Sequence, residues 1–319
     1  MLDSFIYSLN IIAPIFIIVV LGALLKRTKF LSDDFLAVCD RLVFKICLPS
    51  LLFIDIATAS TDENIDFGLI IFCVAAVVIS FLLPCFIVPI FIKDNAKRGA
   101  FIQGMYRSNA AILGMTLAES MFGDAGSTTI AMILPFIVTL FNVFAVIILS
   151  LYAPADVKLT HSELIKRIVK TIVTNPLIIS IVLALLWRLT GITLPTLVDK
   201  SLNYLADMSM PLALLSLGAN FTFESLRGRV GLAITSSALK TIVVPGLTVA
   251  AAIMLGYRGV GLGVVFIIFG GPAAVSSYIM AKQMKSDYEL ASQILLISTL
   301  MSLFTMFLGI FILKAAGLI

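Results

Sequence analysis

The sequence predicts an all-α membrane protein of ten transmembrane helices, arranged as two five-helix repeats of inverted topology. Three observations carry this prediction. The 319 residues are 61% hydrophobic and only 13% charged, whereas an average soluble domain is about half apolar and a quarter charged. Apolar runs long enough to cross a bilayer recur ten times along the chain. Matching residues in the two halves recur at a nearly constant offset.

Composition and motifs exclude several classes of protein. The net charge of +4 is spread over loops without a basic and aromatic patch, so we expect no nucleic-acid partner. The four cysteines lie in apolar runs without metal-ligand spacing, and we expect no metal, cofactor or disulfide framework. No nucleotide-binding motif is present, so direct ATP drive is not expected. Met1–Ser4 lacks the basic residues of a signal peptide, which predicts that the first span is retained.

A transmembrane helix needs about 20 apolar residues. The predicted spans are Ile6–Leu25, Phe35–Ala57, Phe67–Ile92, Ala100–Phe122, Ser127–Leu151, Ile172–Leu189, Leu194–Leu217, Val230–Leu255, Val260–Met280 and Leu290–Leu313. We expect the spans that adjoin Pro49, Pro176 and Pro211 to be the least regular.

These spans divide the chain into a first repeat over residues 1–151, a cytoplasmic linker over 152–171 and a second repeat over 172–319. Apolar residues recur at helical spacing over Leu164–Val173, with basic residues on another face. This segment is either an interfacial helix or a plain extension of span six.

Lysine and arginine are unevenly distributed among the loops. The loops after the odd-numbered spans hold 14 of these residues, and the opposite loops and span ends hold 4. Because cytoplasmic loops are enriched in Lys and Arg, both termini are predicted to face outside. The prediction is a multi-pass protein of the cell membrane.

The internal repeat has an offset of 162 or 163 residues. Pro49 in span two matches Pro211 in span seven, and Ala110-Ala111 in span four matches Ala273-Ala274 in span nine. Two further pairs of segments match at the same offset, Gly68-Leu69 with Gly231-Leu232 and Leu140–Asn142 with Leu303–Thr305. Since five spans is an odd number, the second copy enters the membrane from the opposite side. Inverted repeats of this kind are typical of alternating-access transporters.

Spans four and nine each contain a polar, helix-weakening interruption, Arg107–Gly114 and Gly270–Ser277. Irregular backbone at membrane depth is tolerated only where it is buried in protein or lines a cavity. Paired interruptions at matching places in two halves indicate a transporter binding site. The alternative is that Gly and Ser are simply common in packed membrane helices.

These features together resemble the auxin efflux carrier family, which includes bacterial permeases and malonate-type carriers. The segments that carry the resemblance are Lys45–Pro49, Arg107–Asn109 with Gly114, and Gly270–Pro272. The resemblance implies that spans four and nine cross at their breaks and hold an organic anion there. It also implies that spans one, two, six and seven form a scaffold against which the crossing bundle moves. One departure is that span four has no proline.

The interruptions supply most of the candidate substrate-binding residues. The Asn109 amide both donates and accepts hydrogen bonds. The Arg107 guanidinium could bind a carboxylate through two parallel hydrogen bonds, or could instead snorkel. Half-helices that begin beside Asn109 and after Pro272 would add N–H groups and favour an anion. The predicted substrate site consists of Lys45, Arg107, Ser108, Asn109, Gly114, Gly270, Gly271 and Pro272.

Charges inside membrane spans are costly, so each is a functional candidate. Lys45 and Asp207 each precede the proline of their span by four residues. They are either a carboxylate-attracting lysine and a proton-carrying or gating aspartate, or a structural ion pair. Lys240 needs either a partner or water and could neutralise Asp207 or Glu119; these three residues are the candidates for coupling or gating. We expect Asp40 and Arg41, near the cytoplasmic end of span two, to snorkel.

The predicted function is secondary transport of a small organic anion across the lipid bilayer by alternating access, with a homodimer as a possible assembly. The alternatives are a sodium-coupled symporter of the bile-acid type and a membrane sensor or channel. An enzyme is not expected, because the only histidine, His161, lies in a loop and no zinc-protease motif or nucleophile elbow is present.

Overall fold

The computed structural model describes residues 14, 17–58, 66–110, 114–152, 166, 169–170, 173–220 and 230–319. Over these residues the regular structure is helical, without strands, and one isolated β-bridge pairs Ser108 with Ala273. The prediction of an all-α protein is therefore confirmed. Most of the 152–171 linker, and with it most of the predicted Leu164–Val173 segment, lies outside the described residues.

The helices follow in chain order. They are the segment over residues 17–27, α2 (Asp33–Leu42), η1 (Val43–Cys47), α3 (Leu48–Ala57), α4 (Phe67–Phe91), α5 (Asn95–Tyr106), α6 (Met115–Phe122), α7 (Asp124–Leu151), α9 (Pro176–Leu189), α10 (Thr196–Asp207), α11 (Ser209–Asn220), α12 (Val230–Ala238), η4 (Leu239–Val243), α13 (Val244–Met254), α14 (Gly259–Gly270), α15 (Ser276–Gln283) and α16 (Tyr288–Ala315).

Four continuous helical stretches in the described residues are long and apolar enough to cross a bilayer, Phe67–Phe91, Asp124–Leu151, Val230–Met254 and Tyr288–Ala315. Two shorter apolar helices, α9 and α14, lie within other predicted spans. Predicted spans two and seven consist of shorter helical pieces that follow one another closely, α2, η1 and α3 in span two and α10 and α11 in span seven.

Prolines account for several of these joints. A proline ring clashes with the carbonyl four residues earlier and removes one helical hydrogen bond. Ahead of Pro49 and Pro245 the helix widens into the π-helical turns η1 and η4, which relieves the clash without ending the helix. Ahead of Pro211, α10 ends at Asp207. Pro176 instead lies at the first turn of α9, where its missing N–H is not needed.

Side-chain caps begin five of the described helices. Ser32, Asp66, Asp94 and Asp287 each accept a hydrogen bond from a backbone N–H in the first turn of α2, α4, α5 and α16. Asn175 does the same for α9. These residues satisfy N–H groups that have no partner inside the helix.

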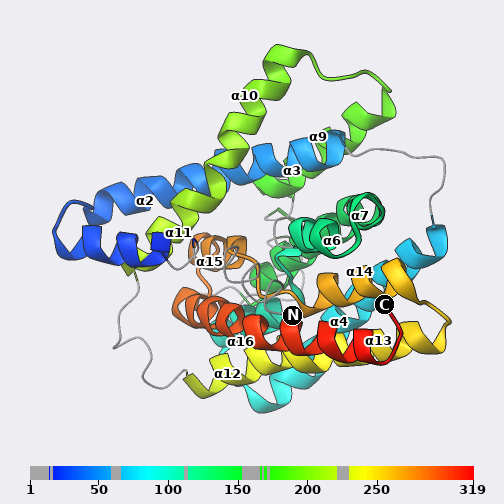
Figure 1. The fold of residues 1–319 in the computed structure, drawn as a ribbon. Helices are drawn as coiled ribbons and strands as arrows, with labels where there is room; N and C mark the ends of the chain where they lie inside the picture. Colours follow the sequence, from blue (N-terminus) through cyan, green and yellow to red (C-terminus); the bar gives the residue numbers. More distant parts are fainter. Residues whose placement is uncertain are drawn as a thin grey trace.

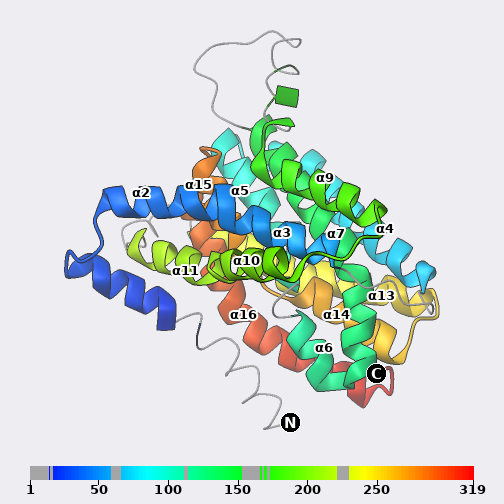
Figure 2. The same ribbon diagram turned by 90° about the horizontal axis from the view of Figure 1, so that it is seen from above.

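The helices form two groups (Figure 1). We call α2, η1, α3, α9, α10 and α11 the scaffold helices, because each packs mainly on others of this set. The remaining helices, α4–α7 and α12–α16 with η4, are the crossing helices, and α16 runs along α12 among them. Figure 2 shows α3 and α10 side by side, in agreement with their contacts. The two groups meet where α15 contacts α11, η1 and α2 and where α7 contacts α3 and α9.

Candidate functional site

Both predicted interruptions coincide with the end of a helix. After α5 ends at Tyr106, Arg107 is extended, with φ −79° and ψ 121°, and α6 begins only at Met115. After α14 ends at Gly270, Gly271 is extended, with φ −60° and ψ 154°, and α15 begins at Ser276. We call residues 107–109 the first break and residues 271–275 the second break.

The two breaks contact each other through their backbones. Ser108 and Ala273 form the β-bridge, and the Asn109 N–H donates to the Pro272 carbonyl over 2.9 Å. The Ala273 N–H donates to Ser298 Oγ on α16 over 3.1 Å. Each break therefore supplies hydrogen-bond partners that the other lost when it left the helix, as a water-free interior requires.

The expectation that Pro272 lies in the first turn of a half-helix is wrong. Pro272 precedes Ser276, the first residue of α15, by four residues, and the N-cap position is Val275. The hydrogen bonds at the Pro272 carbonyl and the Ala273 N–H hold this part of the chain extended instead.

Glycine is needed where the breaks approach each other. A Cβ atom on Gly271 would lie 2.9 Å from Ser108 Oγ and 3.3 Å from the Ile267 carbonyl oxygen. A Cβ on Gly270 would lie 2.8 Å from Met306 Sδ. Both glycines thus permit close packing and do not themselves contact a ligand.

We expect Gly271→Ala to destabilise the protein by about 1–3 kcal/mol, because overpacking forces neighbouring atoms to move. Adding Ser108→Ala removes the nearest clashing atom and should restore most of the loss. Thermal unfolding in detergent measures both variants. Gly231→Ala is the matched control, since a Cβ there meets nothing within 4 Å. Equal stability of Gly271→Ala and the parent would contradict the close approach.

A cavity of about 170 Å³ lies between the breaks and the scaffold helices. Its lining comes from six elements: α3, α7, α11, the first turn of α15 and the two breaks. The residues are Leu48, Leu51, Leu52, Asp55, Arg107, Ser108, Asn109, Val138, Phe141, Asn142, Ser209, Met210, Ala213, Ala274, Val275 and Ser276. The structure therefore brings Arg107, Ser108 and Asn109 together at one cavity.

Arg107 is the cation of this cavity and is only 3% exposed. Its Nη2 donates to Asn142 Oδ1 and to Ser276 Oγ, both over 2.7 Å, and its Nη1 donates to Met280 Sδ over 2.6 Å. All three acceptors are neutral, and no described carboxylate forms an ion pair with Arg107. Arg107 is thus a buried charge without a counter-ion, and it does not snorkel.

The other polar groups at the cavity are neutral, with one exception. Asn109 lines the cavity and is 8% exposed, and its backbone N–H donates to the Pro272 carbonyl. Asn142 and Ser209 add further polar atoms. The exception is the carboxyl group of Asp55 on α3. Our sequence reasoning missed Asp55, although an aspartate inside a predicted span is a signal that could have found it.

Besides Gly270, Gly271, Pro272 and Lys240, four predicted residues are absent from the cavity lining. Lys45 and Asp207 are exposed, and no ion pair joins them in the described structure. Glu119 is exposed on α6. Gly114 is buried at the start of α6, where a Cβ would lie 3.0 Å from Ile130 Cδ1. None of these four contributes to the cavity wall.

The partner of Lys240 in the structure is neither Asp207 nor Glu119 but a backbone carbonyl. It is fully buried in η4, and its Nζ donates to the Phe269 carbonyl oxygen over 2.6 Å. Phe269 lies in the last turn of α14, directly before the second break. A cation at a helix C-terminus satisfies a free carbonyl and complements the helix dipole. Lys240 therefore stabilises the end of α14.

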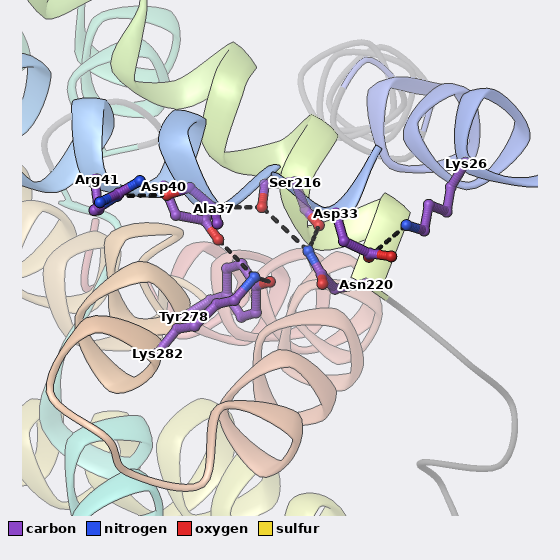
Figure 3. Close-up of polar contacts among 9 residues, drawn as sticks. All are labelled: Lys26, Asp33, Ala37, Asp40, Arg41, Ser216, Asn220, Tyr278 and Lys282. Carbon is purple, nitrogen blue, oxygen red and sulfur yellow. Dashed lines mark hydrogen bonds and ion pairs between the residues drawn. The ribbon is translucent and has the colours of Figure 1, made fainter. Parts of the chain in front are cut away.

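The expectation that Asp40 snorkels is also wrong. Its side chain is fully buried and forms an ion pair with Lys282 of α15 at 2.5 Å, while the Ser216 hydroxyl of α11 donates to its other oxygen (Figure 3). Asn220 in turn donates to Ser216. Arg41 is exposed and donates only to the Ala37 carbonyl of its own helix. We call Asp40, Ser216, Asn220 and Lys282 the Asp40 cluster; it joins two scaffold helices to the half-helix after the second break.

The family model described as "Membrane transport protein" matches residues 7–310. An uncharacterized transporter of Methanocaldococcus jannaschii is 24% identical over 304 residues, which cover 92% of this chain and 95% of that protein. The "Putative malonate transporter" of Rhizobium meliloti is 22% identical over 97% of both chains. Auxin efflux carrier component 3a of Oryza sativa is 28% identical over 36% of this chain and 19% of its own length.

Proposed function

Because this chain belongs to the membrane transport protein family, the family of the auxin efflux carriers, we propose that it is a secondary transporter that carries a small organic anion through the cavity at the two breaks. It is a multi-pass membrane transporter and not an enzyme. The proposal concerns its substrate, its site and its mechanism.

The observation that carries the proposal is the environment of Arg107. A buried guanidinium held by neutral acceptors is a costly arrangement unless an anion comes to it. Arg107 lies in the wall of the cavity, where a carboxylate can reach it and accept charge-assisted hydrogen bonds. The Asn109 amide on the same wall offers one more donor.

The cavity volume of about 170 Å³ favours a substrate of a few carbon atoms. The malonate named for the Rhizobium meliloti relative is a compound of this size and charge. We therefore propose a small mono- or dicarboxylate as the substrate class.

In the proposed architecture, ten spans form two inverted five-helix repeats over residues 1–151 and 172–319, and both termini face outside. The two breaks then lie near the middle of the membrane, as in transporters built from discontinuous helices. The scaffold helices belong to spans two, six and seven, and the crossing helices belong to spans three to five and eight to ten.

Alternating access requires that contacts between the two groups of helices break and re-form. The cavity is lined by Leu48–Asp55 in the second half of span two, whereas Asp40 lies in its first half. In the proposed topology the first half faces the cytoplasm. We propose that the Asp40 cluster closes the cytoplasmic side in this conformation, so that the cavity opens to the outer side of the membrane.

Uptake of labelled malonate into proteoliposomes tests the proposal. We expect saturable uptake that falls at least tenfold in Asn109→Ala, because the amide lines the cavity while its backbone hydrogen bond survives the substitution. Varying the sodium and pH gradients separately then identifies the coupling ion.

Asn203→Ala is the matched control, since Asn203 lies on α10 and its amide donates to the Asp199 carbonyl, away from the cavity. Uptake that is unaffected by Asn109→Ala would refute the site at the breaks. Failure to take up malonate, longer dicarboxylates and monocarboxylates alike would refute the organic-anion substrate.

A further inference from the structure

Among the described residues that line the cavity, Asp55 is the one that carries a carboxyl group. Asp55 lies near the end of α3 and is half-buried. We infer that Asp55 is a proton-binding residue of the transport cycle, so that one proton is carried together with the anion held at Arg107. This inference rests on the proposed function and identifies the proton as the ion that is coupled to anion transport.

The first support is that Asp55 and Arg107 share the cavity. They are the only two ionisable side chains among its lining residues, and they come from different groups of helices. Asp55 belongs to the scaffold helices and Arg107 to the first break of the crossing helices. In the proposed transport cycle, movement of one group against the other changes what Asp55 faces.

The second support is that Asp55 has no compensating partner in the described structure. It forms no ion pair and accepts no hydrogen bond there, and no charged side chain acts on it. The helices packed on α3 are η1, α7, α9 and α10. Their ionisable side chains are Lys45, Cys47, Asp124, Arg188, Asp199, Lys200, Tyr204 and Asp207. None of these lines the cavity.

Electrostatics then links the proton to the anion. An ionised Asp55 repels a carboxylate in the same small cavity, where the low dielectric strengthens the repulsion. Protonation of Asp55 removes it, so the anion binds more tightly as the pH falls. Linkage is reciprocal, so a bound anion increases the proton affinity of Asp55 by the same factor. We expect a factor of about ten or more, since unit charges a few ångströms apart near protein interact by several RT.

Sodium is a weaker fit to this position than a proton. Metal cations of this kind are bound by several oxygen ligands together. Of the oxygen-bearing side chains described as lining the cavity with Asp55, Asn142 and Ser276 already accept hydrogen bonds from Arg107. A single carboxyl group can hold a proton without further ligands.

Calorimetry on the full chain in detergent tests the inference, with malonate as the probe. Titrations in two buffers of different ionisation enthalpy give the number of protons taken up per anion. Titrations between about pH 5 and pH 8 cover the range in which a carboxyl group that is desolvated in a protein can titrate. For the parent we expect proton uptake on binding and at least tenfold tighter binding at the acid end.

Asp55→Asn should bind malonate at pH 8 as tightly as the parent does at pH 5, with no proton uptake and no pH dependence. Asp199→Asn on α10, outside the cavity, should behave like the parent. In proteoliposomes, Asp55→Asn should exchange malonate but should no longer accumulate it against a gradient when driven by external acid.

Three results would overturn the inference. The first is malonate binding without proton uptake, and the second is unchanged proton uptake in Asp55→Asn. The third is binding that requires sodium at any pH. All three leave the proposed anion transport in place. A chain that binds no malonate or other carboxylate at any pH would instead overturn the proposed function and the inference with it.

Discussion

Asn142→Asp is expected to reduce anion binding by at least a hundredfold while the fold is retained. The Asn142 Oδ1 atom lies 2.7 Å from Arg107 Nη2, and an aspartate of nearly the same shape would put a permanent carboxylate at that distance. The new ion pair would neutralise the guanidinium and repel an entering anion. A hundredfold loss corresponds to about 2.7 kcal/mol, which is within the range for a charge pair at such a distance.

Malonate titration of the purified protein measures the effect. The substitution costs the hydrogen bond from the Asn142 amide to the Val138 carbonyl, so thermal unfolding is recorded beside the titration. Asn203→Asp adds the same charge on α10, outside the cavity, and should leave the affinity unchanged. If Asn142→Asp bound malonate as tightly as the parent, Arg107 would not be the anion-binding group.

The interruptions could be predicted from the sequence because their signal is local. Arg107–Gly114 and Gly270–Ser277 place Gly, Ser, Asn and Pro inside apolar runs, and each of these residues weakens a helix by itself. The first break forms without a proline, and the Pro272 carbonyl of the second break accepts the hydrogen bond that the Asn109 N–H would otherwise lack.

The remaining cavity residues could not be predicted in this way, because they lie on regular helices. Asn142 is in the middle of α7, and its role depends on the packing of α7 against the first break. Ser209 begins α11 after a joint that the sequence does indicate, but its neighbours come from distant parts of the chain. Such contacts are decided by tertiary packing, which composition and periodicity do not contain.

The charged residues show the same limit. Lys45 and Asp207 are equivalent positions of the repeat that the sequence predicts. Equivalence places two residues in similar environments and not in contact, unless both lie near the symmetry axis. Lys282 follows predicted span nine, which ends at Met280, so the sequence marks it only as a loop lysine. In the structure it lies at the end of α15. Its pairing with Asp40 joins residues at opposite ends of the chain, and only the packing of α15 on α2 and α11 reveals it.

The last prediction concerns that pair. Asp40→Asn is expected to open the cytoplasmic side of the protein in a larger fraction of molecules, by about tenfold. Loss of one partner of a buried ion pair typically costs about 3–5 kcal/mol, much of it from the charge left behind. Here the remaining charge is Lys282, which is 22% exposed at its side chain and can turn to water, so the expected effect is smaller. The free energy lost from the closed conformation shifts the population toward the open one.

A single cysteine at Ala213, which lines the cavity, reports this change in a chain whose four native cysteines are replaced by serine. An impermeant thiol reagent added from the cytoplasmic side should react about ten times faster in Asp40→Asn, and more slowly from the outer side. Arg41→Gln, at the exposed neighbouring residue, should change neither rate. Unchanged labelling together with a lower unfolding temperature would mean that the Asp40 cluster only ties the helices together. Faster labelling from the outer side would instead reverse the proposed topology, because the cluster and the cavity would then open to the opposite faces of the membrane.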